Sequence, residues 1–429
     1  MEKKMGAGVY VAGLGVISAI GNDMAECLAA LESGQAGMGP ITYLETTHRQ
    51  IIPVAEVKLN NEELADRVDM TMRENTGKAN RMNSTALLSR IERKSQADLI
   101  SRTALLSMIA ASAALDDAAI DSLPSLRTGF LSANTVGGMD KSEHFFADFL
   151  QDPKQGRLRD VVQHECGTVT EWVADQLGIR HYISTISTAC SSSANAIFFG
   201  ARLIKHGLLD VVVAGGADSL TKFTLNGFNT LMILDQQYCK PFDENRNGLN
   251  LGEGAGYIVL VSEKVAATLR RKLYCRLSGY CNANDAYHQT ASSPDGTGSW
   301  LAMKGALERS GLQPADIDYI NLHGTGTQNN DLAEGTAIKR LFDGAYPRMS
   351  STKSFTGHTL GASGGIEAVF SALSVNQGLV YPNLRFATPM TELPFIPETY
   401  FLKNEPIRHV LSNSFGFGGN CSSLIFSKL

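Results

Sequence analysis

This sequence of 429 residues has few charged residues and no CxxC motif. Charged residues make up only 19% of it, the net charge is −5, and no long run of Lys or Arg occurs, so nothing indicates a nucleic-acid partner. The seven cysteines are odd in number and include no CxxC pair, which argues against a disulfide framework and a structural zinc site. We therefore expect a protein of the reducing cytoplasm.

Long hydrophobic runs are also absent. The apolar stretch 9–20 follows charged residues and so has the outline of a secretory signal, but glycines interrupt or flank it and no clear cleavage site follows. The stretch is too short to span a bilayer. We predict a first core strand with a glycine turn, and no membrane insertion.

What is present is an alternation of strands and helices, with glycine-rich turns at strand ends. No Pro- or Ser-rich linker divides the chain, so we predict two tightly fused α/β halves, residues 6–262 and 263–429, with an elaborated polar region at about 35–95. The predicted strands are 9–14, 128–133, 182–186, 211–214, 249–261, 273–282, 317–322, 410–414 and 422–426. The predicted helices are 23–32, 61–72, 95–115, 161–177, 192–206, 263–271, 299–310, 332–342 and 366–377.

Cys190 is a candidate nucleophile at the break in the stretch STISTACSSSANAIFF, residues 184–199. The β-branched residues before it predict a strand, small residues end that strand, and a helix follows. A thiol in the first turn of a helix lies at the positive end of the helix dipole, which favours the thiolate by roughly 0.3–2 kcal/mol, or about one pKa unit. A buried structural cysteine is an equally good interpretation of this stretch alone.

A histidine loop follows a predicted strand in the second half. The motif HGTGT places His323 at the strand end, among small residues that leave room for a ligand. Asp331 and Glu334 lie three positions apart on one face of the next helix. Taken alone, the histidine is more often structural, and the two acids are either solvated or orient buried polar groups.

Two further glycine-rich stretches carry chemical groups. In TKSFTGHTLGASGG, residues 352–365, Lys353 stands five residues before His358, at a helix N-terminus that lowers the pKa of a nearby imidazole and keeps it neutral. In NSFGFGG, residues 413–419, a turn exposes backbone N–H groups suited to an oxyanion hole. Taken alone, the first stretch can equally be interpreted as a helix-entry loop whose Lys and His are solvated. The second can equally be interpreted as a glycine-rich hairpin turn.

Together the motifs resemble, in family order, those of the elongating β-ketoacyl-acyl-carrier-protein synthases, which carry a Cys-His-His set. The resemblance implies a thiolase-like fold in α-β-α-β-α layers. It also implies a decarboxylating Claisen condensation of an acyl-enzyme with malonyl-acyl-carrier protein, without metal or redox cofactor, on phosphopantetheine-borne substrates. The motifs are STACSSS (187–193), GGADS (215–219), PFDENRNGLNLGEGAG (241–256), NDAYHQTASSPDG (284–296), HGTGT (323–327), TKSFTGHTLGASGG (352–365) and NSFGFGG (413–419).

The resemblance implies roles for individual residues. Cys190 accepts the acyl group, and His323 and His358 handle the extender unit. Lys353 matches a lysine of the same site. The N–H groups of Cys190 and Phe417 form the oxyanion hole, and the Phe417 ring gates the pocket. The remaining expectations are Asp331, Glu334 and Phe415 as supporting residues, Thr325 and Thr327 on the pantetheine arm, and Val136 and Phe228, by position, in the acyl pocket.

The chain departs from the family pattern at four places. Residues 45–94 carry extra charge, including Arg90, Arg93 and Lys94. GGNC at 418–421 replaces the usual GGTN, the loop at 328–331 reads QNND instead of a proline-containing version, and Asn250 occupies a position that is usually apolar. These departures indicate a divergent member. Fatty-acid elongation and a specialised polyketide or polyene pathway therefore both stay open.

Two other functions compete with this interpretation. A thiolase uses a second cysteine near the C-terminus, where Cys421 lies, but the motif around His358 argues against it. A non-catalytic subunit that sets chain length in a heterodimer shares the fold but lacks the nucleophile, whereas Cys190, His323 and His358 are all present.

The implied partners are acyl-carrier protein and a second copy of the chain. Because acyl-carrier protein is acidic, we expect a basic rim near the pocket entrance. A solvated basic face is an equally good interpretation of the candidates, which are Arg90, Arg93, Lys94 and Arg102.

Overall fold

The computed structural model describes residues 8–78, 100–120 and 123–429. Three of the four candidate rim residues, Arg90, Arg93 and Lys94, lie outside the described residues, as does the predicted start of the helix at 95–115.

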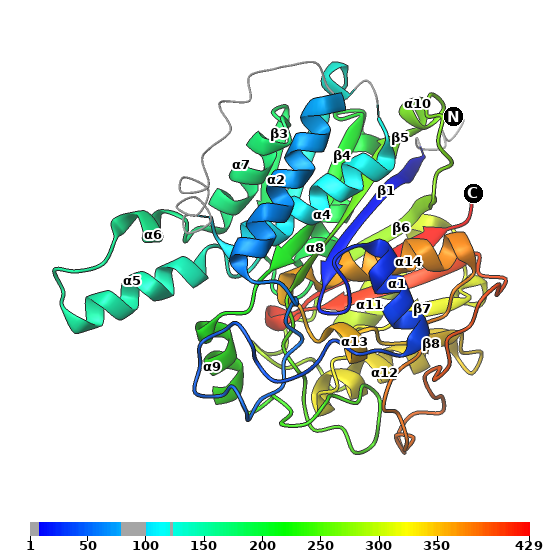
Figure 1. Cartoon of the computed structure of the whole chain (residues 1–429). Coiled ribbons are helices and arrows are strands. Elements are labelled where there is room, and N and C mark those ends of the chain that lie inside the picture. The colour runs from blue at the N-terminus through cyan, green and yellow to red at the C-terminus, as the bar shows by residue number, and fades with distance from the viewer. Residues whose placement is uncertain (1–7, 79–99, 121–122) are drawn as a thin grey trace.

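One mixed sheet organises the described part of the chain, with the strand order β3-β2-β4-β5-β1-β6-β10-β9-β7-β8. The order is the same in both halves when each is followed from its outer edge to the middle. Figure 1 labels β4, β5, β1 and β6, which are consecutive neighbours across the middle of this sheet. The first five strands are β1 (Val9–Ser18), β2 (Thr128–Ala133), β3 (Tyr182–Ile186), β4 (Val211–Asp218) and β5 (Gly254–Ser262). The second five are β6 (Cys275–Asn284), β7 (Tyr319–Asn321), β8 (Arg348–Ser350), β9 (His409–Phe415) and β10 (Asn420–Ser427).

The pairings repeat as well. In the first half β2 pairs in parallel with β3 and β4, and β5 pairs antiparallel with β4 and β1. In the second half β7 pairs in parallel with β8 and β9, and β10 pairs antiparallel with β9 and β6. The halves join where β1 meets β6, through the pairs Tyr10–Arg276 and Val11–Cys275. The sequence shows no obvious repeat, yet the topology is a repeat.

Helices cover both faces of the sheet and fill the space between its halves. Helices α8 (Ser192–Lys205) and α14 (Ser363–Gln377) contact each other and lie between the halves. Helix α4 (Arg102–Ala118) covers the outer face of the first half, and α11 (Thr297–Ser310) that of the second, beside α12 (Gln328–Phe342). The other described helices are α1 (Met24–Ser33), α2 (Asn61–Lys78), α5 (Met139–Gln151), α6 (Leu158–Val162), α7 (Cys166–Gln176), α9 (Lys222–Thr230), α10 (Glu263–Ala266) and α13 (Lys353–Thr356).

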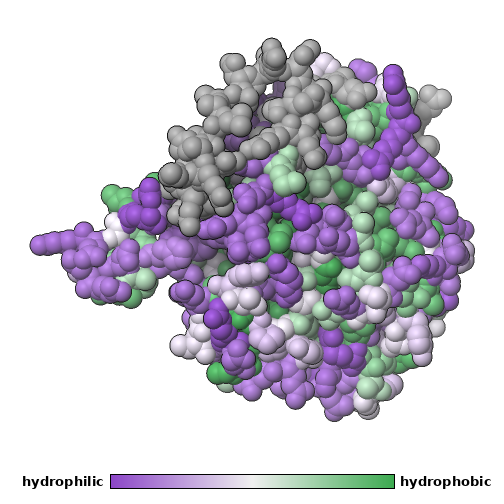
Figure 2. Space-filling view, in the orientation of Figure 1, coloured by the Kyte–Doolittle hydropathy of each residue, from purple (hydrophilic) through white to green (hydrophobic). Residues whose placement is uncertain are grey.

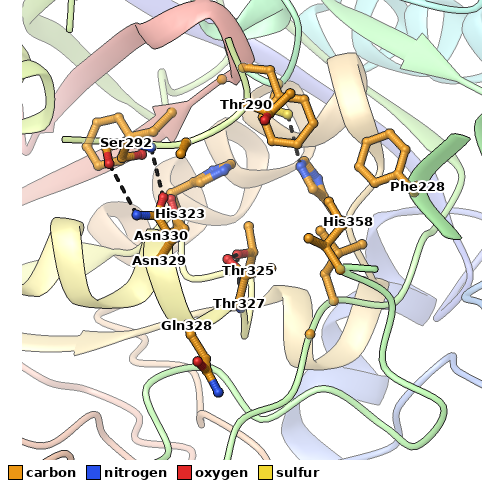
Figure 3. A pocket seen from close by; sticks show the side chains of 18 of the residues that line it. Phe228, Thr290, Ser292, His323, Thr325, Thr327, Gln328, Asn329, Asn330 and His358 are labelled. Carbon is orange, nitrogen blue, oxygen red and sulfur yellow. Dashed lines mark hydrogen bonds between the residues drawn. The ribbon is translucent and has the colours of Figure 1, made fainter. Parts of the chain in front are cut away.

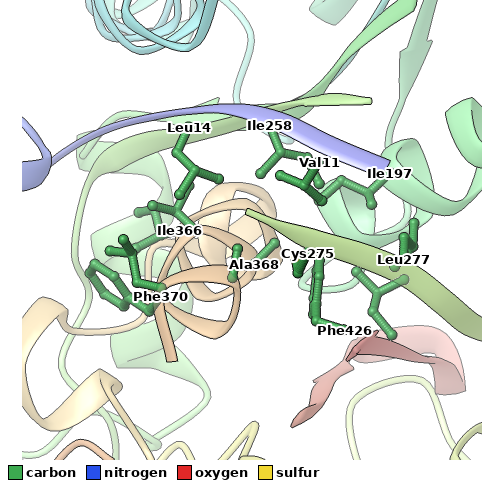
Figure 4. Close-up of a cluster of buried hydrophobic side chains, with 14 of the residues drawn as sticks. Val11, Leu14, Ile197, Ile258, Cys275, Leu277, Ile366, Ala368, Phe370 and Phe426 are labelled. Atoms are coloured by element: carbon green, nitrogen blue, oxygen red, sulfur yellow. The ribbon is translucent and has the colours of Figure 1, made fainter. Parts of the chain in front are cut away.

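The central core lies between these layers (Figure 4). Val11 of β1 lies beside Ile197 of α8, and Leu14 of β1, Ile366 of α14 and Phe426 of β10 belong to the same buried cluster. Burying one such side chain stabilises the fold by about 1.5–3 kcal/mol. This core fixes the positions of the strand ends, where the loops with functional side chains begin.

Several local predictions were wrong. The helix predicted at 263–271 is only the short α10, which ends at Ala266, and the strand predicted from residue 249 begins at Gly254. The segment 161–177 is two helices, α6 and α7, rather than one. Strand β4 continues through the glycines that were expected to end it, because a Cβ at Gly215 would lie 2.0 Å from the carbonyl oxygen of Gly256 on β5, and only glycine allows that approach. Helices α5 and α9 were not predicted, because each carries exposed apolar side chains such as Phe146 and Phe223 and lacks a clear buried face.

The surface is mixed in character. Hydrophilic residues cover most of the face in Figure 2, with hydrophobic residues scattered among them. Among the described helices, none has both the length and the apolar character needed to cross a bilayer.

Candidate active site

A cavity of about 470 Å³ lies beyond the ends of strands from both halves. Cys190 follows β3 in the first half, His323 follows β7, His358 follows β8, and Phe417 follows β9 in the second. All four line the cavity, and Figure 3 shows both histidines projecting into it. Of the described residues that line the cavity, none is Asp, Glu, Lys or Arg, so its wall is uncharged.

Cys190 stands on a strained turn between strand and helix. Ala189 adopts the left-handed conformation with φ 53°, which is uncommon for a residue with a Cβ and recurs at functional sites. Thr188 N–H donates to Ser192 Oγ at 2.8 Å and so closes the turn. Helix α8 begins at Ser192, so Cys190 precedes the helix by two residues and does not lie in its first turn as predicted.

The thiol of Cys190 is buried, with a relative exposure of 5%. Burial raises its pKa to about 11, although the positive charge of Lys353 and the backbone N–H groups of Phe417 and of Cys190 itself act in the opposite direction. The predicted gain of about one pKa unit from the helix dipole is therefore outweighed by desolvation, and the resting group is a thiol.

The turn at Phe417 packs directly on the nucleophile. A Cβ at Gly416 would lie 3.0 Å from the backbone N of Cys190, so a glycine there lets the two turns meet. The N–H groups of Phe417 and Cys190 both approach the sulfur, which is the arrangement an oxyanion hole needs. The Phe417 ring stacks on Phe228, with centroids 5.7 Å apart and planes 16° apart.

Asn420, the residue that departs from the family pattern, joins the two turns from behind. Its Oδ1 accepts hydrogen bonds from Ser191 Oγ at 2.7 Å, Asn195 Nδ2 at 2.8 Å and Asn282 Nδ2 at 2.6 Å. Its backbone carbonyl accepts from Gly416 N–H at 2.9 Å. Asn420 stands one position earlier than the asparagine of the family's GGTN, and it links strands of the second half to the nucleophile turn of the first.

The two histidines meet at the sulfur. His358 Nε2 lies 3.0 Å from Cys190 Sγ, and the two imidazole rings are 5.4 Å apart at 85°. One ligand atom from each of the three residues lies within 4.8 Å of the others. Burial lowers the pKa of both histidines well below 6.5, and Lys353 lowers both further, so both rings are neutral at pH 7.

Lys353 decides which nitrogen of His323 carries the proton. The ammonium lies 3.3 Å from His323 Nδ1 and has only donors to offer, so Nδ1 accepts and Nε2 keeps its hydrogen. That state suits a hydrogen-bond donor and opposes metal ligation through Nε2. Lys353 is 1% exposed and forms an ion pair with buried Glu367 of α14.

Two buried carboxylates of α12 hold the histidine loop. Glu334 accepts the backbone N–H of His323 at 2.9 Å and that of Gly324 at 2.8 Å, and burial raises its pKa to about 7. Asp331 accepts from Thr325 N–H at 3.0 Å and from Phe242 N–H at 2.8 Å. The two acids predicted on one helix face therefore orient backbone groups and are not solvated.

The remaining predicted residues divide into two groups. Thr325, Thr327, Phe228 and Phe415 line the cavity. Val136 does not line it and is instead 2% exposed in an apolar cluster with Leu225, Leu251 and Leu360.

The rim candidate Arg102 and the thiolase candidate Cys421 both lie outside the cavity lining. Arg102 is 7% exposed and forms an ion pair with Glu253, so it is not a residue of a surface rim. Cys421 is buried beside Phe415 and Ala302, outside the cavity lining, so it does not supply the second cysteine of a thiolase.

Sequence reasoning missed several residues that hold the site. Asn250 was noted only as unusual, yet its carbonyl accepts the N–H of His358 at 2.7 Å, and its buried amide donates to three backbone carbonyls. Asp218, in the GGADS motif, accepts from Thr135 N–H at 2.8 Å and from Gly361 N–H at 2.7 Å, and burial raises its pKa to about 6. Both stood in quoted motifs, but their partners lie far away in the sequence.

The QNND segment, expected as a loop, forms the first turn of α12, and its three amide residues Gln328, Asn329 and Asn330 line the cavity. Asn329 Oδ1 accepts from Ser292 N–H at 2.8 Å, and Asn329 Nδ2 donates to the Ser292 carbonyl at 3.2 Å (Figure 3). This second departure from the family pattern fastens the loop 284–296 to the start of α12.

Comparisons with known proteins cover nearly the whole chain. The family "Beta-ketoacyl synthase, N-terminal domain" matches residues 7–266, and "Beta-ketoacyl synthase, C-terminal domain" matches residues 274–387. The 3-oxoacyl-[acyl-carrier-protein] synthase 2 of Staphylococcus aureus (strain COL) is 32% identical over 98% of each chain. Its counterpart in Rhizobium meliloti (strain 1021) is 40% identical over 61% of this chain and 65% of its own.

Solved structures give the same result. The ishigamide ketosynthase/chain length factor superposes with a TM-score of 0.87, at 26% identity over 99% of this chain and 100% of its own. A beta-ketoacyl synthase from Burkholderia phymatum STM815 superposes with a TM-score of 0.81, also at 26% identity and with the same coverage of both chains.

Proposed function

The chain belongs to the beta-ketoacyl synthase family and is a 3-oxoacyl-acyl-carrier-protein synthase, and on that premise we propose which residues perform each step of its condensation. The thiolase-like fold and the acyltransferase class predicted from the sequence are confirmed. The complete Cys-His-His set argues against a non-catalytic chain-length subunit. The observation that carries the residue assignment is the contact of Cys190 Sγ with His358 Nε2 at 3.0 Å, beside the His323 ring.

The first half-reaction loads the acyl chain on Cys190. The thiol sulfur attacks the carbonyl carbon of acyl-acyl-carrier protein, the carbon–sulfur bond to the carrier arm breaks, and the thiol proton ends on the carrier sulfur. The tetrahedral oxyanion accepts hydrogen bonds from the N–H groups of Cys190 and Phe417. Because the thiol pKa is about 11, deprotonation accompanies attack and does not precede it.

The second half-reaction extends the chain. Malonyl-acyl-carrier protein loses carbon dioxide, and the electron pair of the broken bond forms an enolate whose oxygen accepts hydrogen bonds from Nε2–H of His323 and of His358. The enolate carbon then attacks the acyl-enzyme carbonyl, and the Cys190–carbon bond breaks to release the 3-oxoacyl product. The electron pair of that bond goes to the sulfur, and the resulting thiolate takes up one proton from solvent to restore the thiol. Each donor of this kind typically contributes about 2.7–4 kcal/mol to the barrier reduction.

The uncharged wall favours a carrier-borne substrate. The pantetheine arm is neutral, and Thr325 and Thr327 lie along the cavity where the arm would pass. Among the described lining residues, no cation is present to hold the phosphates of a free coenzyme A or the malonyl carboxylate. A carboxylate without a partner in such a cavity is destabilised relative to carbon dioxide.

The proposed active form is a homodimer in which the edge strand β3 of one subunit contacts β3 of the other. This strand is the outer edge of the first half, so one row of its backbone groups is open to another strand. Ile183 on β3 is 39% exposed, and the neighbouring projection of α5 and α6 carries exposed Phe146, Leu150 and Val162. Ile183→Lys therefore shifts the chain from dimer to monomer in light scattering, whereas Leu429→Lys at the exposed C-terminus does not.

The test of the reaction is intact-mass analysis with a panel of acyl-carrier proteins that bear saturated, unsaturated and aryl chains. The expected result is one acyl mass per chain, transferred at least about tenfold faster from the carrier than from the matching coenzyme A thioester. Equal rates from both donors would refute the carrier preference. The chain that transfers fastest assigns the enzyme to fatty-acid or specialised synthesis.

A further inference from the structure

Each catalytic imidazole has a partner on the nitrogen that faces away from the cavity. For His323 this partner is the ammonium of Lys353, 3.3 Å from Nδ1. For His358 it is the hydroxyl of Ser363, 3.0 Å from Nδ1. Ser363 is the first residue of α14 and is 2% exposed, so the contact is buried.

A hydroxyl differs from an ammonium in that it can donate or accept. The Ser363 oxygen also lies 3.2 Å from Thr359 Oγ1, and Thr359 is 1% exposed. Thr359 can therefore donate to Ser363 while Ser363 donates to His358. The reverse chain, in which His358 Nδ1–H donates to Ser363, satisfies the same oxygens, so hydrogen-bond counting alone does not choose between the two tautomers.

The position of Ser363 makes the choice. It opens a helix of fifteen residues, whose N-terminus carries a positive partial charge. A lone pair on Nδ1 is favoured beside that charge, whereas an N–H bond directed at it is disfavoured. The preferred chain therefore runs from Thr359 to Ser363 to His358 Nδ1, and the ring proton resides on Nε2, which faces Cys190 at 3.0 Å.

We propose that Ser363 is a positioning residue that holds the proton of His358 on Nε2, as Lys353 does for His323. The two rings then present matching donors to the enolate oxygen, one set by a charged partner and the other by a neutral one. This inference rests on the proposed two-donor step. A neutral partner suits His358, because a second buried cation beside the sulfur would need a second buried anion, as Lys353 needs Glu367.

The test is Ser363→Ala, examined in the two half-reactions separately. Decarboxylation of malonyl-acyl-carrier protein, followed by carbon dioxide release, should fall by about 10- to 100-fold, less than the roughly 10²–10³-fold loss of a whole donor. Acylation of Cys190, followed by intact mass, should change by less than about threefold, because its oxyanion hole consists of backbone groups. In ¹⁵N-histidine NMR spectra, the His358 signals should shift toward the Nδ1–H tautomer.

Two variants control for structure. Ser371→Ala makes the same change two turns later on α14, at a fully buried hydroxyl with no hydrogen-bond partner among the described residues, and should leave both half-reactions unchanged. Ser363→Thr keeps the hydroxyl and should retain decarboxylation within about threefold of the parent enzyme.

Three outcomes would overturn the proposal. They are an equal loss of both half-reactions in Ser363→Ala, an unchanged tautomer in the NMR spectra, and a loss in Ser363→Thr as large as in Ser363→Ala. Failure of the underlying mechanism is distinguishable, since His358→Ala would then decarboxylate malonyl-acyl-carrier protein at the normal rate whatever Ser363→Ala does.

Discussion

The two halves share one topology but use their corresponding strand ends differently. The counterparts β3 and β8 are followed by Cys190 and His358, while β2 and β7 are followed by the Val136 loop and by His323. Strand β4 ends at Asp218, a buried acceptor of backbone N–H groups, whereas its counterpart β9 is followed by the Phe417 turn. One half thus supplies the nucleophile and the other supplies the donors.

The supports differ in charge as well as in role. The Cys190 turn is held mainly by neutral groups, among them Ser192 and Asn420. His323 is held by Glu334 and by the Lys353–Glu367 pair, whereas His358 has the neutral partner Ser363. A nucleophile that must gain negative charge only during attack is served by neutral groups and backbone N–H donors. A charged partner that cannot exchange donor and acceptor roles fixes the tautomer of His323, whereas in our proposal Ser363 at the N-terminus of α14 fixes that of His358.

Removal of the first half's contribution should have the largest effect. Cys190→Ala removes the one thiol among the described residues that line the cavity, so acyl transfer should be abolished. Intact-mass analysis after exposure to acyl-acyl-carrier protein checks this, with Cys281→Ala, a thiol on β6 outside the cavity lining, as the matched control. A Cys190→Ala protein that still gained the acyl mass would refute the assignment.

Removal of a charged support in the second half should cost stability. Lys353→Met leaves Glu367 as an uncompensated buried carboxylate, and we expect a loss of about 3–5 kcal/mol in the free energy of unfolding, measured by urea denaturation. Lys353→Met/Glu367→Gln should recover part of it. Lys403→Met breaks an exposed pair with Glu32 and should cost less than about 1 kcal/mol. Equal losses in the two single variants would contradict the role of burial.

Removal of either histidine should separate the half-reactions. His323→Ala and His358→Ala each lose one enolate donor, so decarboxylation should slow by about 10²–10³-fold, which corresponds to roughly 2.7–4 kcal/mol. Acylation of Cys190 should be affected far less, because the oxyanion hole is built from backbone N–H groups. Carbon dioxide release and intact mass measure the two steps. Normal turnover in either variant would refute the two-donor scheme.

The sequence was a good guide to what is local and a poor guide to what is shared between distant segments. Strands β2 and β3 match the prediction in both bounds, because each is a short apolar run with turn residues around it. Cys190 could be identified because its motif is continuous in the sequence. The supports could not, because Asn250 and Asn420 act on residues more than 100 positions away.

The pKa of the Cys190 thiol also could not be predicted from the sequence, because it depends on segments that are distant in the sequence. A helix dipole can be inferred from the order of residues, but the burial that raises the pKa of Cys190 to about 11 arises from loops of both halves closing over it. Val136 does not line the cavity and lies in an apolar cluster against which Phe228 packs, so its role in the acyl pocket stays a prediction. The predicted division of the chain after residue 262 stays a prediction.

Substitution of Asn420 tests the hydrogen bonds that link the two halves, and its expected effect is smaller than those above. Asn420→Ala leaves the donors of Ser191, Asn195 and Asn282 without their shared acceptor, so the free energy of unfolding should fall by about 1–3 kcal/mol. Acylation should also slow, because Ser191 and Asn195 beside Cys190 lose their side-chain link to the Phe417 turn. Asn420→Asp keeps the acceptor oxygens and should retain more of both. Equal behaviour of the two variants would show that the oxygen is not what matters.

The smallest expected effect is on the pH profile, where the two halves should differ. Burial lowers the pKa of His323 and His358 well below 6.5, so both rings are already neutral above that pH, and decarboxylation should change less than about twofold between pH 6.5 and 8. Burial raises the pKa of Cys190 to about 11, so its thiolate fraction, and with it the rate of alkylation by iodoacetamide, should rise about tenfold per pH unit over the same range. A decarboxylation profile with an inflection near pH 6.5 would mean that a histidine titrates there, and the charged support in the second half would then not hold a neutral donor.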